Sequence, residues 1–245
     1  MIVVNRIRRS AMAWLLPWRC TLCGNPGMPG LDLCAACHAD LPWNTSACPG
    51  CARPLPAGAS AWRCGACLSH PPAWDIAFSA LHYALPVDAL VQQLKFQGRL
   101  ARARLLGELL AQALQSERHT PWPAALIPVP LHPSRLRERG FNQARELALP
   151  LARHFAIPLR DDLVRRIRAT APQVGLTAAA RARNLRGAFA IDGAPPAHVA
   201  LVDDVLTTGS TLTAMSLALR AAGSTQIEVW TPARSTSEHV PAQTR

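Results

Sequence analysis

The spacing of apolar residues changes along this chain, and from about residue 75 onward it alternates between helical and strand patterns. Segment 87–98 has four apolar residues at three- and four-residue intervals, which predicts an amphipathic helix, and segment 100–114 continues as a second helix. The apolar run at 124–131 is flanked by prolines and is too brief for a helix, so it predicts a buried strand, as does the run at 199–202.

The other segments continue this alternation. They predict a basic loop leading into a helix at 135–155, a strand within 161–168, an arginine-bearing helix at 175–189, a helix at 211–222 and a strand at 227–231. Pro150 should kink or end its helix, because proline lacks the backbone N–H that a helix needs. Strands alternating with helices indicate an α/β domain, here 75–235, whose parallel sheet has helices on both faces.

The N-terminal segment resembles a signal peptide only superficially. Its apolar patch, 11–16, is too short for the hydrophobic region of such a peptide, Pro17 ends it, and no small-residue cleavage site follows. We interpret 1–17 as an N-terminal helix or arm of a cytoplasmic protein, and 236–245 as a disordered tail. We expect no membrane span, since no apolar run approaches the roughly 18 residues that one needs.

All eight cysteines lie in four CxxC pairs within the first 67 residues. A CxxC turn places two thiolates on one side of the backbone, and two such pairs about ten to twelve residues apart form a four-thiolate zinc ribbon. The sequential assignment gives one ion the ligands Cys20, Cys23, Cys34 and Cys37, and the other the ligands Cys48, Cys51, Cys64 and Cys67. Interleaved pairing of the four turns stays open.

Zinc is favoured over three alternatives for these cysteines. A disulfide framework belongs to secreted proteins, iron–sulfur ligation is less typical of this spacing, and a redox CxxC does not need four copies. We therefore predict a double zinc ribbon at 18–70 that holds about two structural zinc ions. Because all four positions around each ion are filled by sulfur, neither ion is expected to carry out chemistry.

The positive charge of the chain is concentrated in one region. The formal net charge is +11, and all basic residues except Lys95 are arginines. Between residues 135 and 186 there are 12 arginines against four acidic residues, which gives this segment a charge of +8. Such a concentration favours a polyanionic ligand or partner.

One predicted strand ends in an unusual set of polar residues. The run 199–202 leads directly into Asp203 and Asp204, and a turn of small residues, 207–211, precedes the next helix. Ligands of parallel sheets bind beyond the carboxyl ends of the strands. Carboxylates there can accept hydrogen bonds from the hydroxyls of a ribose, and free amides at a helix N-terminus suit a phosphate. The pattern therefore indicates a cradle for a ribose 5-phosphate.

The stretch ALVDDVLTTGST resembles the phosphoribosyl-diphosphate (PRPP) motif of type I phosphoribosyltransferases. Four CxxC pairs, then LKFQG (94–98), PVPLHPSRLRERGFNQA (128–144) and APQVGLTAAARARNLRGAF (171–189), occur in the order seen in the ComF/GntX family. The resemblance covers residues 17–234. It implies a phosphoribosyltransferase-like α/β fold preceded by a zinc-ribbon module, and it includes ComFC-like competence proteins associated with DNA uptake in natural transformation.

The resemblance also implies roles for single residues. Asp203 and Asp204 would hold the ribose 2′- and 3′-hydroxyls, and a Mg²⁺ ion would accompany PRPP because its diphosphate needs charge neutralisation. The 5′-phosphate would be surrounded by Thr207, Thr208, Gly209, Ser210 and Thr211. The diphosphate loop would run from Leu131 through His132 to Arg139, with Arg135 and Arg139 facing the diphosphate. Ser210 departs from the Gly-Gly of many true transferases, so its side chain would narrow the turn.

Three functions stay open at this stage. The first is a PRPP-binding protein that acts in DNA uptake, contacts single-stranded DNA and works with a competence-associated helicase. The second is an active phosphoribosyltransferase, and the third is a zinc-ribbon adaptor with a vestigial PRPP site. The arginine-rich segment favours the first, because single-stranded DNA is an extended polyanion. The DNA-contact candidates are Arg165, Arg166, Arg168, Arg181 and Arg183.

No acceptor site or catalytic group for a transferase is evident in the sequence. Lys95 and His132 are candidate polar groups, but each is better interpreted as an ordinary surface or structural residue. Phe141 fits a core position as well as a stacking platform for a base, and no nucleophile–base pair is apparent.

Overall fold

The computed structural model describes residues 18–59, 62–117, 121–168 and 187–236. The chain divides into two compact units, Met1–Pro42 and Trp43–Arg245. The division falls between the two groups of cysteines, so the range 18–70 contributes to both units. Helix α2 (Ala35–Ala39) belongs to the first unit, and α3 (Gly65–Ser69) belongs to the second.

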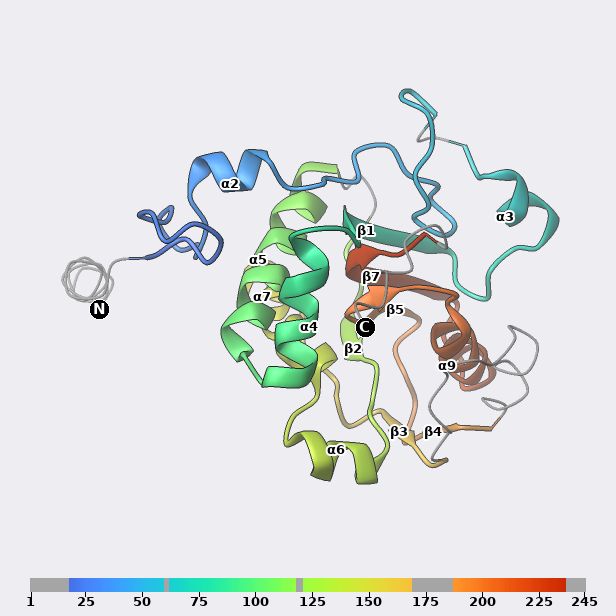
Figure 1. Ribbon diagram of the computed structural model, residues 1–245. Coiled ribbons are helices and arrows are strands. Elements are labelled where there is room, and N and C mark those ends of the chain that lie inside the picture. Colours follow the sequence, from blue (N-terminus) through green and yellow to red (C-terminus); the bar gives the residue numbers. More distant parts are fainter. Residues whose placement is uncertain (1–17, 60–61, 118–120, 169–186, 237–245) are drawn as a thin grey trace, which may run out of the picture. The chain divides into compact units, whose positions relative to one another are not determined.

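A parallel sheet forms the centre of the second unit (Figure 1). Its strands lie side by side in the order β1 (Ile76–His82), β7 (Gln226–Arg234), β5 (His198–Val202) and β2 (Ala125–Pro128). All of these pairs are parallel, and the short β6 (Val205–Leu206) pairs with β7 in the same sense. A separate antiparallel ribbon consists of β3 (Val164–Arg166) and β4 (Phe189–Ile191).

Helices cover both faces of the sheet (Figure 1). On one face, α5 (Leu100–Glu117) packs on β1 and β7, α7 (Gln143–Phe155) packs on β2 and β5, and α4 (Val87–Gln97) packs on α5. On the other face, α9 (Ser210–Ala221) buries Leu212, Met215 and Leu219 in one cluster with Ile227 and Val229 of β7. The predicted α/β class with a parallel sheet is confirmed.

β1 is not among the strands that the sequence predicts. The central residue of this strand, Ser79, is polar but only 1 % exposed. Its hydroxyl lies 2.6 Å from that of Thr231 on the neighbouring β7, which satisfies both groups inside the sheet. The buried hydroxyl pair therefore allows a polar residue in the middle of this strand. The two residues of the pair are 152 positions apart in the chain.

Of the two effects expected of Pro150, a kink or an end of the helix, the structure excludes the second, because α7 continues to Phe155. The proline lies at the contact between α7 and α5, opposite Gly107. A Cβ atom at Gly107 would lie 2.7 Å from the carbonyl oxygen of Leu147 and 2.8 Å from Cγ of Pro150. The glycine therefore allows the two helices to approach closely, and the proline ring is buried in their contact.

Some of the segments that the sequence predicts cannot be compared with the structure. The N-terminal arm, nearly all of the arginine-bearing helix expected at 175–189, and residues 237–245 lie outside the described residues. Among the described helices, none combines the length and the apolar character that a membrane crossing requires.

Candidate functional site

Two carboxylates follow the carboxyl end of β5, as the sequence predicts. The backbone N–H of Asp203 donates to the carbonyl oxygen of Trp230 at 3.2 Å, so Asp203 is still held by the neighbouring strand. The chain then turns, and the N–H of Asp204 donates to Oδ1 of Asp203 at 2.9 Å. Because of this turn, the side chains of Asp203 and Asp204 both lie at the end of β5, and the residue Asp204 is only 4 % exposed.

Lys95 of α4 reaches this site from a distant part of the chain. Its Nζ lies 2.9 Å from Oδ1 of Asp204. Burial lowers the pKa of Lys95, but the adjacent Asp204 carboxylate outweighs this effect, so the pKa is raised and the ammonium stays charged. The sequence interpretation did not assign Lys95 to the site. Its only signal was its place in the LKFQG motif.

The second oxygen of Asp204 is available to a ligand. Asp204 Oδ2 is buried and has no hydrogen-bond partner. A buried charged acceptor without a partner costs roughly 1–3 kcal/mol or more, so a hydroxyl donor that reaches this oxygen gains that interaction. This is the chemistry that the 2′- and 3′-hydroxyls of a ribose supply.

Asp203 can change its protonation state near neutral pH. Burial raises the pKa of Asp203 to about 7, and the nearby charge of Asp204 adds to the shift, although Lys95 and Arg166 act in the opposite sense. Near neutral pH this carboxyl group therefore exists in both forms. It can accept a hydrogen bond from a sugar hydroxyl when ionised and donate one when protonated.

The turn after the carboxylates forms the N-terminus of α9. Gly209 is the residue that precedes the helix, with φ +74°, and it provides no side-chain cap for the first amides. Thr207 and Thr208 are exposed, and the hydroxyl of Thr208 lies 3.0 Å from that of Ser210. Uncapped amides, the positive end of the helix dipole and several hydroxyls together suit a phosphate.

The predicted diphosphate loop begins beside the carboxylates. Pro128 of β2 pairs with Val202 of β5, and the N–H of Val129 donates to the carbonyl oxygen of Val202 at 2.9 Å. Most of the predicted loop, however, is a helix, α6 (Pro133–Arg139), which the sequence analysis missed. His132 begins this helix, since its Nδ1 accepts from the N–H of Ser134 at 3.3 Å.

The two arginines of this segment differ in environment. Arg135 is exposed, whereas Arg139 is partly buried and donates to Oε1 of Gln143 at 2.6 Å. Burial and the charge of Arg135 lower the pKa of Arg139, and the Asp204 carboxylate partly opposes this effect. The guanidinium of Arg139 therefore lies within electrostatic reach of Asp204.

Three of the five DNA-contact candidates lie among the described residues, and their environments differ. Arg165 is exposed and forms a bidentate pair with Asp192. Burial lowers the pKa of Arg166, while Asp203 raises it and Arg135 lowers it further, so this side chain adjoins the cradle rather than lying apart from it. Arg168 is exposed. Arg181 and Arg183 lie outside the described residues.

A groove of about 810 Å³ is lined in part by the predicted diphosphate loop. We call it the arginine groove. Its apolar lining includes Leu131, Leu136, Phe141, Val164 and Ile167, and its basic lining consists of Arg137, Arg145, Arg165 and Arg166. Glu146 and Asp161 also line it, and Arg145 donates to Asp161 at 2.6 Å. Phe141 is thus a groove residue that is partly exposed.

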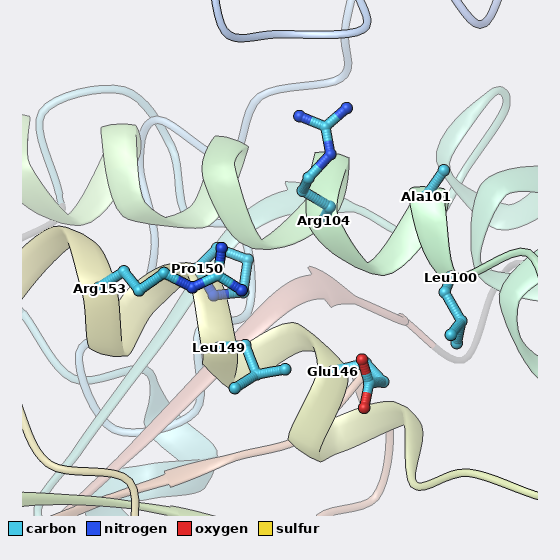
Figure 2. A pocket seen from close by; sticks show the side chains of 7 residues that line it. All are labelled: Leu100, Ala101, Arg104, Glu146, Leu149, Pro150 and Arg153. Atoms are coloured by element: carbon cyan, nitrogen blue, oxygen red, sulfur yellow. The ribbon is translucent and has the colours of Figure 1, made fainter. Parts of the chain in front are cut away.

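A smaller cavity of about 290 Å³ lies between α5 and α7 (Figure 2). Arg104 projects from α5, and Glu146 and Arg153 project from α7; Leu100 and Leu149 also line the cavity. None of its lining residues belongs to the predicted cradle.

The cysteines form two groups with the sequential assignment. In each group the four sulfur atoms lie within 4.8 Å of one another. The Sγ atoms of Cys23 and Cys34 are 3.7 Å apart, as are those of Cys51 and Cys64. Zn–S bonds of about 2.3 Å in a tetrahedron place sulfurs about 3.8 Å apart, so both groups fit zinc. No third group of three or more potential metal ligands occurs among the described residues.

The second cysteine group packs against the α/β sheet. The N–H of Ala77 on β1 donates to the carbonyl oxygen of Pro49 at 2.8 Å, and the side-chain amide of Asn44 donates to Ala52 and Ser79. Two residues that the sequence did not indicate, Trp74 and Arg234, join this group to the turn Leu206–Thr211, which we call the phosphate turn.

Comparisons with known proteins agree with this architecture. Residues 11–68 match the model of a double zinc ribbon domain. The chain is 38% identical over 220 residues to DNA utilization protein YhgH of Salmonella typhi, covering 88% of this chain and 96% of that protein. It is also 38% identical over 226 residues to competence protein F of Haemophilus influenzae, covering 89% and 97% of the two chains. Zinc ribbon, parallel sheet and nearly full-length similarity together show that this chain belongs to the ComF/GntX family.

Proposed function

We propose that this protein binds PRPP together with Mg²⁺ in the cradle at the end of β5 and acts in DNA uptake. The observation that carries the proposal is the buried, unpartnered Oδ2 of Asp204, a residue that is followed closely in the chain by the uncapped N-terminus of α9. A donor for this oxygen and an anion for the helix amides are the two ends of a ribose 5-phosphate. Mg²⁺ would arrive with the diphosphate, since it is usually held by phosphate oxygens, water and few protein ligands.

The arginine groove supports contact with single-stranded DNA. Exposed Leu136 and Ile167 offer apolar surface to bases, and the arginines around them offer charge to phosphates. Relatives named competence protein F and DNA utilization protein support the same role. A competence-associated helicase stays a predicted partner, and the cytoplasm stays the predicted location.

An active phosphoribosyltransferase with an unidentified acceptor is the second candidate. It is favoured by one observation: burial raises the pKa of Asp203 to about 7, which puts a group able to exchange a proton beside the sugar site. A transferase releases diphosphate when an acceptor displaces it from PRPP, whereas a protein that only binds PRPP does not.

The test is calorimetric titration with PRPP and Mg²⁺, with free diphosphate assayed in the same samples. We expect saturable binding that is weakened about 10-fold or more in the Asp203→Asn/Asp204→Asn variant, since hydrogen bonds to charged groups contribute about 1.5–3 kcal/mol. The matched control is Asp161→Asn/Asp162→Asn, an exposed acidic pair of the same spacing. Equal affinity of all three proteins would show that the cradle is assigned wrongly.

A further inference from the structure

Arg234, at the end of β7, connects the second cysteine group with the phosphate turn. It is only 6 % exposed. Its Nε donates to the carbonyl oxygen of Cys51 at 2.8 Å. Its Nη1 donates to the carbonyl oxygens of Leu206 and Thr207, at 2.6 and 2.8 Å, and also to that of Ser235. One buried guanidinium thus holds a zinc-ligand backbone and the start of the phosphate turn together.

Trp74 makes a second connection between the same two regions. Its Nε1 donates to the carbonyl oxygen of Gly50, inside the CPGC turn, at 2.7 Å. The far edge of its ring lies against Gly209, where a Cβ atom would be only 2.6 Å from Cη2. Gly50 in turn lies against the metal ligands, since a Cβ atom there would be 3.1 Å from Sγ of Cys67. Movement of the CPGC turn would therefore be transmitted to the phosphate turn by direct contact.

The two cysteine groups differ in this respect. Cys48, Cys51, Cys64 and Cys67 lie in the same compact unit as the phosphate turn, whereas the other four cysteines lie in the first unit. We expect the positions of Gly50 and Cys51 to depend on cross-linking of the CxxC turns, because α3 is a single short helix and this segment buries few large side chains. A bound ion supplies that cross-link, since structural zinc contributes roughly 10 kcal/mol or more to the folding of such segments.

We infer that Arg234 and Trp74 are positioning residues through which the metal in the second cysteine group orders the phosphate turn, Leu206–Thr211. When this metal is lost, the carbonyl groups of Gly50 and Cys51 move, so Arg234 loses one of its four carbonyl acceptors and Trp74 loses its hydrogen bond to Gly50. The turn then opens more often, and its amides no longer present one geometry to a phosphate. The effect on ligand affinity rests on the proposed function, whereas the effect on the order of the turn does not.

Hydrogen exchange of the full-length zinc-loaded protein, followed by mass spectrometry, tests the inference. We expect Cys64→Ser, which removes one ligand of the second group, to speed exchange in peptides covering 205–213 about 10-fold or more. Cys23→Ser is the matched control, because it removes one ligand of the first group and should leave these peptides unchanged. Peptides from β2 and β5 should exchange as slowly in both variants as in the original protein.

A second pair of variants distinguishes the positioning of the phosphate turn by Arg234 and Trp74 from other effects of losing the metal. Arg234→Lys keeps the charge but cannot make the forked contact, and Trp74→Phe keeps most of the ring but removes the donor. Both should retain two zinc ions by metal analysis, exchange faster at 205–213 and bind PRPP at least 5-fold more weakly. Arg160→Lys is the control, since Arg160 makes a forked contact with Asp162 that involves neither the second cysteine group nor the turn.

The outcomes are distinguishable. Unchanged exchange at 205–213 in Cys64→Ser that has lost one zinc ion would overturn the inference. If Cys64→Ser does not fold, unchanged exchange in both Arg234→Lys and Trp74→Phe would overturn it instead. If the original protein does not bind PRPP but the exchange pattern is as expected, the proposed function fails and the ordering of the turn by the metal stands.

Discussion

The ammonium of Lys95 lies 2.9 Å from the carboxylate of Asp204, although 109 positions separate the two residues in the chain. Lys95 belongs to α4, and Asp204 follows β5. The ion pair neutralises one oxygen of Asp204 and leaves the other, Oδ2, buried and unpartnered. The pair therefore holds one oxygen of Asp204 inside the site while leaving the other as an acceptor for a ligand.

Replacing Lys95 should destabilise the protein by isolating this carboxylate. Breaking a buried pair costs about 3–5 kcal/mol, but the Lys95 side chain is 25% exposed, so we expect Lys95→Met to lower the free energy of unfolding by only about 1–3 kcal/mol. Urea denaturation measures this loss. Adding Asp204→Asn to Lys95→Met should recover part of the lost free energy of unfolding, because the carboxylate left without its partner is then removed. Strictly additive effects in the double variant would contradict this account of the pair.

Asp203 should make the unliganded protein less stable as the pH rises. Because burial raises its pKa in the folded state to about 7, from about 3.9 in unfolded chains, the folded state binds the extra proton between these values. This contribution to stability is full below about pH 4 and is lost as the pH approaches and passes 7. Denaturation midpoints at pH 5 and pH 8 should differ less in Asp203→Asn than in the original protein. The same pH dependence in both would contradict the raised pKa.

Metal analysis should find about two zinc ions per chain in protein purified without chelator. The two sulfur groups fit tetrahedral zinc, and each should keep or lose its ion independently. We therefore expect about one zinc ion in Cys23→Ser and about one in Cys64→Ser. Iron in place of zinc, or a single ion in the original protein, would overturn the assignment.

Binding to single-stranded DNA should be tolerant of sequence and weaken steeply with salt. Each phosphate contact adds about 0.7 to the slope of log affinity against log salt, so four contacts give a slope of about −3. Fluorescence anisotropy with labelled oligonucleotides measures it. Arg137→Glu/Arg165→Glu, in the arginine groove, should lower the affinity at least 10-fold, while Arg104→Glu/Arg153→Glu, at the cavity of Figure 2, should change it little. Equal losses would indicate a general charge effect.

A related prediction concerns two arginines outside the described residues. Reversing the charges of Arg181 and Arg183 to Glu should abolish DNA binding while changing PRPP affinity by less than about 1 kcal/mol, if they contact DNA at a separate site. Calorimetry and anisotropy on the same preparation measure the two effects. Loss of PRPP affinity in parallel with DNA affinity would show that these arginines serve the diphosphate instead.

The sequence by itself determined the features that depend on local spacing. The period of apolar residues predicted the helices at 87–98 and 100–114 and the strand before Asp203, because burial of one face imposes that period. Four CxxC pairs indicated two zinc sites, because a metal needs its ligands at short separations. The acidic strand end and the glycine-containing turn predicted the ribose 5-phosphate cradle, because the two halves of this cradle are adjacent in sequence.

Only the tertiary structure decided the features that join distant segments. β1 was missed because its polar Ser79 is satisfied by Thr231 on another strand, and Pro150 stays within α7 in close contact with Gly107 of α5. Lys95 enters the cradle by the packing of α4, and Arg234 and Trp74 join the second cysteine group to the phosphate turn. No local pattern encodes such contacts, because a buried charge or ring finds its partner only after the sheet has assembled.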